Sequence, residues 1–297
     1  MQLTESAPNH SWQRARKVNR LADLEPVPQA RAMQITSRDG LQISFETVGR
    51  GHPLVLLHGF FGDSTTWRSA GHVDALADNF RLVLIDARGH GGSDAPHDVD
   101  SYRIDRQVDD VIAVLDALNI GQTTLWGASM GGIIGLHLLA RHPERLAGLI
   151  AGGAHADRVA ADPAEVEQEA DLFRAQGTAP FIGMLERQKP LPAWMRTAMQ
   201  TADPHALAAL TAALADRSSV LDSLTHSSVP VLLLAGDHDP QLPAIRQTAA
   251  QTPSATLVEL PDCGHFDAFL RIDLTLPAVQ PFLARCSARF EGDTESL

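Results

Sequence analysis

Residues 124–133 read TLWGASMGGI, a serine between glycines with an apolar run on each side. The run that ends at Trp126 is typical of a buried strand, and the apolar residues from position 133 onward recur at helical spacing. Gly127, Ser129 and Gly131 lie between these two patterns. The order strand, Gly-x-Ser-x-Gly, helix predicts a tight turn that presents a serine hydroxyl.

This composition suits a turn in which the serine acts as a nucleophile. A strained backbone projects the hydroxyl from the sheet, and side chains at Gly127 or Gly131 would collide with the turn. The following helix adds a partial positive charge near a developing oxyanion. The bare pattern is weak, since residues 91–95, GGSDA, nearly repeat it. The strand before it and the helix after it give it weight.

A serine hydroxyl is a poor nucleophile without a base, so an acid and a histidine are expected after later strands. The apolar run 231–235 leads into Gly-Asp-His-Asp, which ends at Asp239. The run 256–260 leads into a loop that contains His265. The predicted triad is therefore Ser129, Asp239 and His265 in that chain order. Asp237 is a local alternative for the acid, and Asp157 is a more distant one.

The rest of the chain alternates between short apolar runs and amphipathic helical patterns, as along residues 104–118. Runs that are apolar on both faces predict buried parallel strands. Such alternation is typical of an α/β fold, a wound and mostly parallel sheet with helices on both faces. A hairpin of residues 33–36 and 41–48, joined through Asp39 and Gly40, is expected at one edge. The predicted parallel strands are 54–57, 82–85, 124–126, 146–151, 231–235 and 256–260.

The domain organisation follows from where this alternation stops. Residues 156–225 show no convincing strand and are too long for a connector, so we expect a helical cap over the C-terminal edge of the sheet. The core then comprises residues 33–155 and 226–297. Residues 1–32 form a polar N-terminal extension, in which 12–24 fit a short helix.

Five motifs in this order resemble those of the α/β-hydrolases over roughly residues 33–290. The resemblance implies an eight-stranded, mostly parallel sheet and makes Asp239 the triad acid. It also implies that the backbone N–H groups of Phe60 and Met130 form an oxyanion hole. The motifs are His58–Phe61, Asp86–Asp94, Gly127–Gly131, Gly236–Asp239 and Gly264–Phe266.

These residues predict a cofactor-free serine hydrolase that forms an acyl-enzyme on Ser129 and cleaves a small carboxylic ester. His265 would move the proton and Asp239 would orient the imidazole. Phe61 and His155 are candidate substrate contacts. Family members with the same triad suggest alternative reactions for this chain. These are cleavage of carbon–carbon bonds in diketones, hydrolysis of lactones or thioesters, and perhydrolysis. A slow-turnover small-molecule receptor or regulatory protein is the alternative from a different class.

The remaining reactive residues have structural interpretations. Cys263 lies close to His265 in sequence, but an inert buried thiol is expected because Ser129 is the better nucleophile. The two cysteines make no disulfide framework, which fits a reducing cytoplasm. His58, His90, Asp86 and Arg88 are expected to brace their loops.

Composition narrows the partners to a small-molecule substrate. The chain has 297 residues and a formal net charge of −12, which disfavours nucleic acid and anionic lipid. The sequence contains neither a membrane-spanning apolar run nor the apolar core of a secretory signal. No motif predicts a metal, a phosphate-binding loop or a dinucleotide cofactor.

Overall fold

The computed structural model describes residues 31–158, 161–187 and 189–294. Most of the predicted N-terminal extension, including the helix expected at 12–24, lies outside the described residues.

The described residues form an eight-stranded sheet in the order β1-β2-β4-β3-β5-β6-β7-β8, which confirms the predicted α/β fold. β1 and β2 form the antiparallel edge, and all pairings from β4 to β8 are parallel. The first strand begins two residues earlier than predicted. The strands are β1 (Arg31–Thr36), β2 (Gln42–Val48), β3 (His52–Leu57), β4 (Phe80–Ile85), β5 (Thr123–Ala128), β6 (Leu146–Gly152), β7 (Val231–Gly236) and β8 (Ala255–Leu260).

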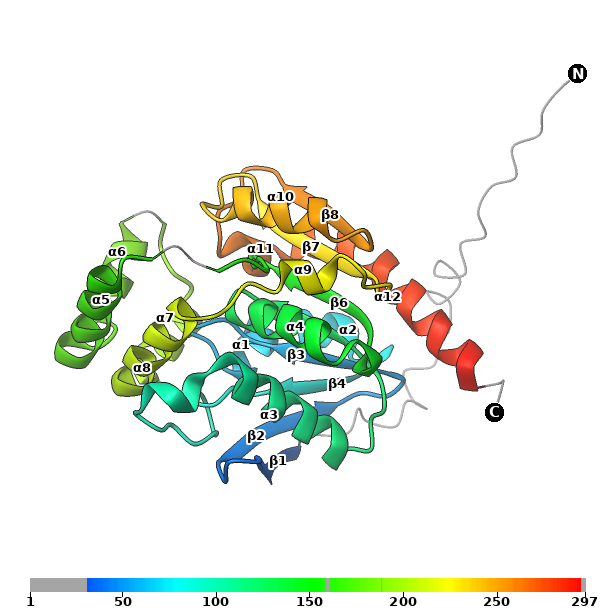
Figure 1. Cartoon of the computed structure of the whole chain (residues 1–297), viewed down its shortest axis with the longest axis horizontal. Coiled ribbons are helices and arrows are strands. Elements are labelled where there is room, and N and C mark those ends of the chain that lie inside the picture. Colours follow the sequence, from blue (N-terminus) through cyan, green and yellow to red (C-terminus); the bar gives the residue numbers. More distant parts are fainter. Residues whose placement is uncertain (1–30, 159–160, 188, 295–297) are drawn as a thin grey trace, which may run out of the picture.

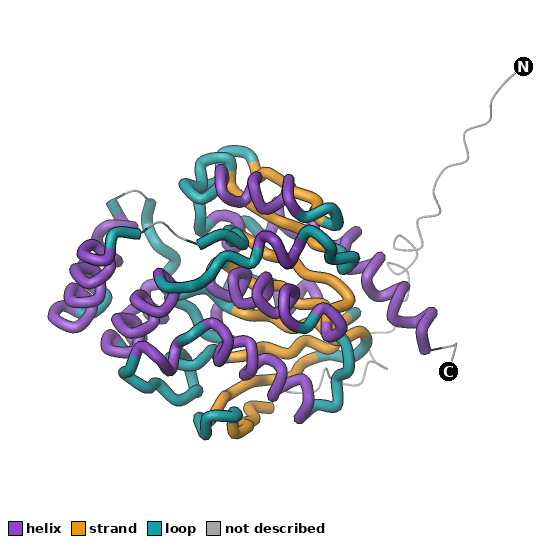
Figure 2. Tube along the Cα trace, in the orientation of Figure 1, coloured by secondary structure: helices purple, strands orange, loops and turns teal. Residues whose placement is uncertain are grey.

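Burial explains why the central strands read as continuous apolar runs. Every residue of β3, β5, β6 and β7 is buried, because helices cover both faces of the sheet (Figure 2). β8 at the far edge is only partly buried, and its sequence alternates accordingly.

The helices divide into two layers, each with its own hydrophobic core (Figure 1). One layer consists of α3 (Ile104–Ala117), α4 (Met130–Arg141), α9 (Leu221–Leu224) and α10 (Leu242–Gln251). The other consists of α1 (Ser64–Ser69), α2 (His72–Leu76) and α12 (Ile272–Thr294). The short segments η2 (Val99–Tyr102), η3 (Pro143–Arg145) and α11 (Asp267–Leu270) complete these connections.

Of the five described helices between β6 and β7, the first four gather at one side of the sheet (Figure 1). They are α5 (Pro163–Gln176), α6 (Ala179–Glu186), α7 (Ala193–Thr201) and α8 (Pro204–Ala215). Proline in the first turn and a capping aspartate, Asp162 or Asp203, start α5 and α8. α5 packs on α8, whereas α9, within the region predicted as cap, packs on α4 and α10. We call α5–α8 the helical insertion.

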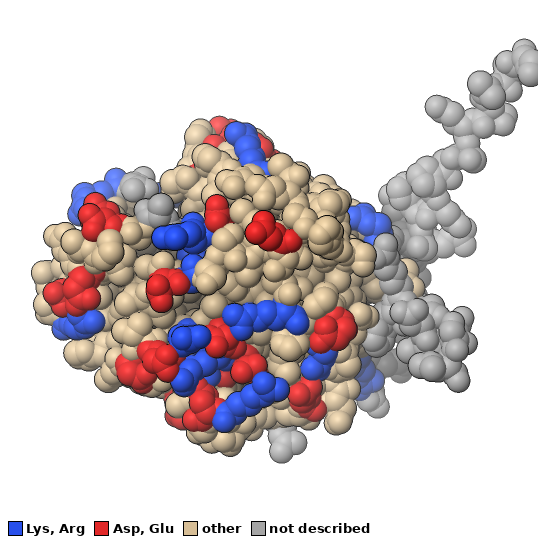
Figure 3. Space-filling model, in the orientation of Figure 1, with Lys and Arg blue, Asp and Glu red and all other residues tan. Residues whose placement is uncertain are grey.

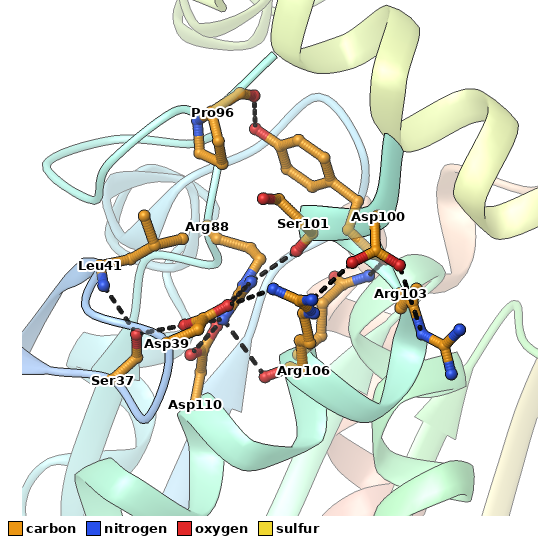
Figure 4. A network of polar contacts seen from close by, with 12 residues as sticks. Ser37, Asp39, Leu41, Arg88, Pro96, Asp100, Ser101, Arg103, Arg106 and Asp110 are labelled. Atoms are coloured by element: carbon orange, nitrogen blue, oxygen red, sulfur yellow. Dashed lines mark hydrogen bonds and ion pairs between the residues drawn. The ribbon is translucent and has the colours of Figure 1, made fainter. Parts of the chain in front are cut away.

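A buried arginine holds the loop after β4 in place (Figure 4). The Arg88 guanidinium donates to both carboxylate oxygens of Asp110, at 2.7 and 2.8 Å, and to those of Asp39, at 2.9 and 3.1 Å. Arg88 holds the pKa of Asp39 well below its usual range. Asp86 accepts from the backbone N–H groups of Ser64 and Gly92, at 2.7 and 2.9 Å. Both residues therefore join separate segments.

Acidic and basic side chains alternate on the face drawn in Figure 3 and form no large patch of one sign. Over the part of the chain that the structure describes, no helix has the length and apolar character needed to span a bilayer.

Candidate active site

Ser129 occupies the turn between β5 and α4, and its backbone conformation requires the glycines around it. Its φ of 49° and ψ of −109° lie in a region that non-glycine residues rarely adopt. A Cβ on Gly127 would come within 2.2 Å of the Gly131 carbonyl oxygen, and one on Gly131 within 2.1 Å of the Leu57 carbonyl oxygen. Only glycine therefore allows α4 to begin this close to β3.

Three side chains from three loops form one chain of hydrogen bonds. The Oγ of Ser129 lies 2.9 Å from Nε2 of His265, and Nδ1 of His265 lies 2.9 Å from Oδ2 of Asp239. An ionised carboxylate only accepts, so Nδ1 carries the proton and Nε2 accepts from the serine hydroxyl. This is the tautomer that a general base requires.

Asp239 is buried, yet its surroundings favour the charged carboxylate. Burial raises the pKa of its carboxyl, but the hydrogen bond and charge of His265 outweigh that effect and leave it below its usual range. The backbone N–H of Gln241 also donates to Asp239, at 2.8 Å.

The other candidate acids lie elsewhere. Asp237 accepts from the backbone N–H of Cys263 at 3.1 Å and so braces the loop that leads to His265. Asp157 accepts from the N–H of Arg158, at 2.8 Å. Cys263 is a buried free thiol, and burial raises its pKa. The structure thus brings Asp239, and neither alternative acid, against His265.

The loop after β3 lies against the start of α4. The N–H of Gly131 donates to the His58 carbonyl at 3.1 Å, and Gly59 approaches so closely that a Cβ there would lie 3.5 Å from Cβ of Ser129. Within the described residues, the backbone N–H groups of Phe60 and Met130 have no acceptor. Two unused donors therefore flank the serine.

Two buried histidines hold this loop. Nε2 of His58 accepts from the N–H of Ala87 at 3.0 Å, so its Nδ1 carries the proton and donates to the Gly59 carbonyl at 2.8 Å. Nε2 of His90 lies 2.8 Å from the Phe60 carbonyl oxygen and its Nδ1 3.1 Å from that of Arg88, so the ring links the two loops. Burial lowers the pKa of His58 to about 4 and lowers that of His90, so both are neutral at neutral pH. Both histidines hold the loop, as the sequence predicts.

A cavity of about 1000 Å³ opens beside Ser129 and His265 and extends under the helical insertion. Phe61 lies in its wall and packs against Phe173 and Phe181, whose rings stack 4.0 Å apart. The other lining residues are mostly apolar, with acidic side chains from α5. They include Trp126, Leu172, Met184, Trp194, Met195 and Phe269, with Glu165, Glu169 and Asp171.

A second cavity, of about 310 Å³, also adjoins Ser129. His155, which the sequence suggested as a substrate contact, lies here rather than in the larger cavity, together with Arg217. Sequence reasoning missed Arg217, because an arginine in the polar stretch after α8 resembles an ordinary surface residue. No group of three His, Cys, Asp or Glu side chains among the described residues is arranged to hold a metal.

The chain belongs to the alpha/beta hydrolase fold family, whose model matches residues 52–183. It is 33% identical over 248 residues to a pimeloyl-[acyl-carrier protein] methyl ester esterase of Nitrosomonas europaea, covering 75% of this chain and 92% of that protein. It is 29% identical to 3-oxoadipate enol-lactonase 2 of Acinetobacter baylyi, covering 69% of this chain and 79% of that protein.

A solved structure of a thermophilic esterase from Thermogutta terrifontis superposes with a TM-score of 0.77 at 26% identity, covering 87% of this chain and all of that one. These relatives are hydrolases, which supports an enzyme of the same broad class.

Proposed function

We propose that the protein is a serine hydrolase that cleaves a small carboxylic ester through an acyl-enzyme on Ser129. The observation that carries the proposal is the hydrogen-bonded chain from Ser129 through His265 to Asp239, at the edge of a cavity. The unused N–H groups of Phe60 and Met130 beside the serine support the same chemistry.

Each group has a defined role in the proposed reaction. As Oγ of Ser129 bonds to the ester carbonyl carbon, Nε2 of His265 takes the hydroxyl proton, and Asp239 stabilises the resulting imidazolium. The N–H groups of Phe60 and Met130 stabilise the oxyanion. The carbon–oxygen bond to the alcohol breaks as His265 returns the proton to it. Water, activated by the same imidazole, then releases the acid and restores the serine.

We further propose that the helical insertion acts as a cap that selects the substrate. Its helices supply much of the larger cavity's wall, and Phe61 of the loop after β3 packs against two of its aromatic rings. An apolar portion of a small substrate fits this environment. Phe61 therefore has a proposed role in binding.

Hydrolysis of short p-nitrophenyl esters tests the proposal. We expect turnover and covalent labelling of Ser129 by a fluorophosphonate, located by peptide mass mapping. Ser129→Ala should abolish both. Ser223→Ala, at an exposed position on α9, is the matched control and should behave as the wild type. Absence of turnover and labelling in the wild type, or full activity in Ser129→Ala, would overturn the proposal. Reversible ligand binding without turnover would instead favour a receptor.

A further inference from the structure

The smaller cavity differs from the larger one in chemical character. It lies against Ser129 and both residues of the proposed oxyanion hole, yet it contains three polar side chains. These are His155, which follows β6, Arg217, which follows α8, and Gln241, which precedes α10 and also lines the larger cavity. Residues from three distant segments thus bring polar groups to the nucleophile.

Arg217 is a buried cation that has no acidic partner among the described residues. Only 7% of the surface of Arg217 is exposed. Its Nη1 donates to the Leu214 carbonyl at 3.0 Å, and its Nη2 lies 3.3 Å from Nε2 of His155. Burial lowers the pKa of Arg217 to about 10, partly offset by the charge of Asp157, which lies too far away to form an ion pair. The guanidinium is therefore charged at neutral pH, and three of its five N–H groups are unused within the described residues.

The neighbouring histidine adds a further unused donor. Arginine cannot accept a hydrogen bond, so Nε2 of His155 is the acceptor and its proton lies on Nδ1. That Nδ1 is buried and has no partner within the described part of the chain. Buried donors and a buried cation are costly unless something compensates them. An anionic ligand would supply that compensation.

We propose that this cavity binds a carboxylate of the substrate, so that the ester cleaved at Ser129 is one that also bears a free acid group. The proposal rests on the proposed hydrolase function and specifies its substrate class. A guanidinium fork matches the two oxygens of a carboxylate, and a single cation balances its single charge. The volume of about 310 Å³ suits a short acid arm.

The larger cavity supports the same orientation. Its wall includes Glu165 and Glu169, which repel an anionic group, together with an extensive apolar surface. An ester with one acidic and one apolar end would therefore place the acid beside Arg217 and the apolar end under the helical insertion. This arrangement leaves the scissile carbonyl next to Ser129, which both cavities share.

Paired substrates provide the test. Aryl hydrogen esters of succinic, glutaric and adipic acid are compared with analogues in which a carboxamide replaces the free acid. A second series carries the acid in the alcohol part. In one of the two series we expect the wild type to prefer the anionic ester at least about tenfold in kcat/KM. Arg217→Met should lower kcat/KM for that ester by about tenfold to a hundredfold and change the carboxamide by less than about threefold.

Three further variants guard against trivial explanations. Arg246→Met, which removes an arginine paired with Glu259, is the matched control and should leave the preference intact. Arg217→Lys keeps the charge and should retain part of the preference. His155→Leu removes the Nδ1 donor but keeps the cation, and it should cost the anionic ester about threefold to tenfold. It serves as the main test if thermal denaturation shows that Arg217→Met is unfolded.

The outcomes separate the two proposals. If esters are cleaved but Arg217→Met and His155→Leu affect anionic and neutral substrates alike, the carboxylate site is wrong and the hydrolase stands. If no ester is cleaved and Ser129 is not labelled, the hydrolase proposal is wrong. The site is then tested alone by calorimetric titration with glutarate. Binding that is lost in Arg217→Met supports the site, and absence of binding overturns it.

Discussion

Gly131→Ala tests how closely the start of α4 fits the loop that carries Phe60. The added Cβ would lie 2.1 Å from the carbonyl oxygen of Leu57 and 2.8 Å from that of His58. Because Cβ contacts below 3.0 Å are essentially never observed, the two backbones must separate by about 0.9 Å. The same displacement weakens the hydrogen bond from Gly131 to His58, which measures 3.1 Å.

The displacement falls where the proposed oxyanion hole is assembled. A shift of about 1 Å moves the N–H of Phe60 away from the oxyanion, and loss of one such donor lowers kcat by roughly a hundredfold to a thousandfold. KM should change less than kcat, since Gly131 itself lines neither cavity and most of the walls come from other segments. The steric conflict should also lower the free energy of unfolding by about 1–3 kcal/mol.

Steady-state ester hydrolysis, fluorophosphonate labelling and urea denaturation measure these effects. Gly121→Ala is the matched control, because no described atom outside its chain neighbours lies within 4 Å of the position that its Cβ would take, and it should retain wild-type activity. Gly59→Ala should lose an intermediate amount of activity, since its added Cβ would lie 3.3 Å from the nearest atom, the Ala128 carbonyl oxygen. A folded Gly131→Ala enzyme with kcat within threefold of the wild type would refute the reasoning, as would equal losses in all three variants.

Three other substitutions probe the acid, the arginine network and a buried histidine. Asp239→Asn should lower kcat by on the order of ten-thousandfold, because the amide favours the wrong imidazole tautomer, while Asp237→Asn stays within threefold by the same ester assay. Arg88→Met leaves Asp110, whose side chain is 4% exposed, without its cation, and urea denaturation should show a loss of about 3–5 kcal/mol. Burial lowers the pKa of His72 from 6.5 to about 3, so the unfolded chain binds its proton more readily and stability falls as pH drops below 6.5. His72→Phe should flatten that fall by up to about 1.4 kcal/mol per pH unit, measured by urea denaturation between pH 7 and about 4.

Each of these expectations has a distinct contradiction. Equal activity losses in the two aspartate variants would show that the triad acid is misassigned. An unchanged urea midpoint for Arg88→Met would mean that the buried ion pairs make no net contribution to stability. If Arg88→Met is destabilised as expected, adding Asp110→Asn should restore part of the lost stability, because it removes the unpaired buried charge. Parallel pH profiles for the wild type and His72→Phe would show that His72 is not held neutral by burial.

The sequence alone determined the features that depend on local geometry and burial. Strands buried on both faces must be apolar throughout, so the parallel strands were visible as continuous runs. The turn at Ser129 has no room for a side chain at positions 127 and 131, so the two glycines in the sequence predicted its backbone conformation. The chain order of Ser129, Asp239 and His265 followed from their positions after β5, β7 and β8.

Only the tertiary structure decided which distant groups meet. Ser129 and His265 are 136 residues apart, and Arg217 and His155 are 62 apart. Asp237 and Asp239 lie in the same turn, and composition does not distinguish them. Their orientations do: the carboxylate of Asp239 points toward the imidazole of His265, and that of Asp237 points toward the backbone N–H of Cys263. The sequence around Arg217 contains no pattern that predicts its burial, because the burial of an arginine depends on which distant segments pack over it. Arg217 lines the smaller cavity with Ser129 because the segment after α8 leads back to the sheet through α9 and β7.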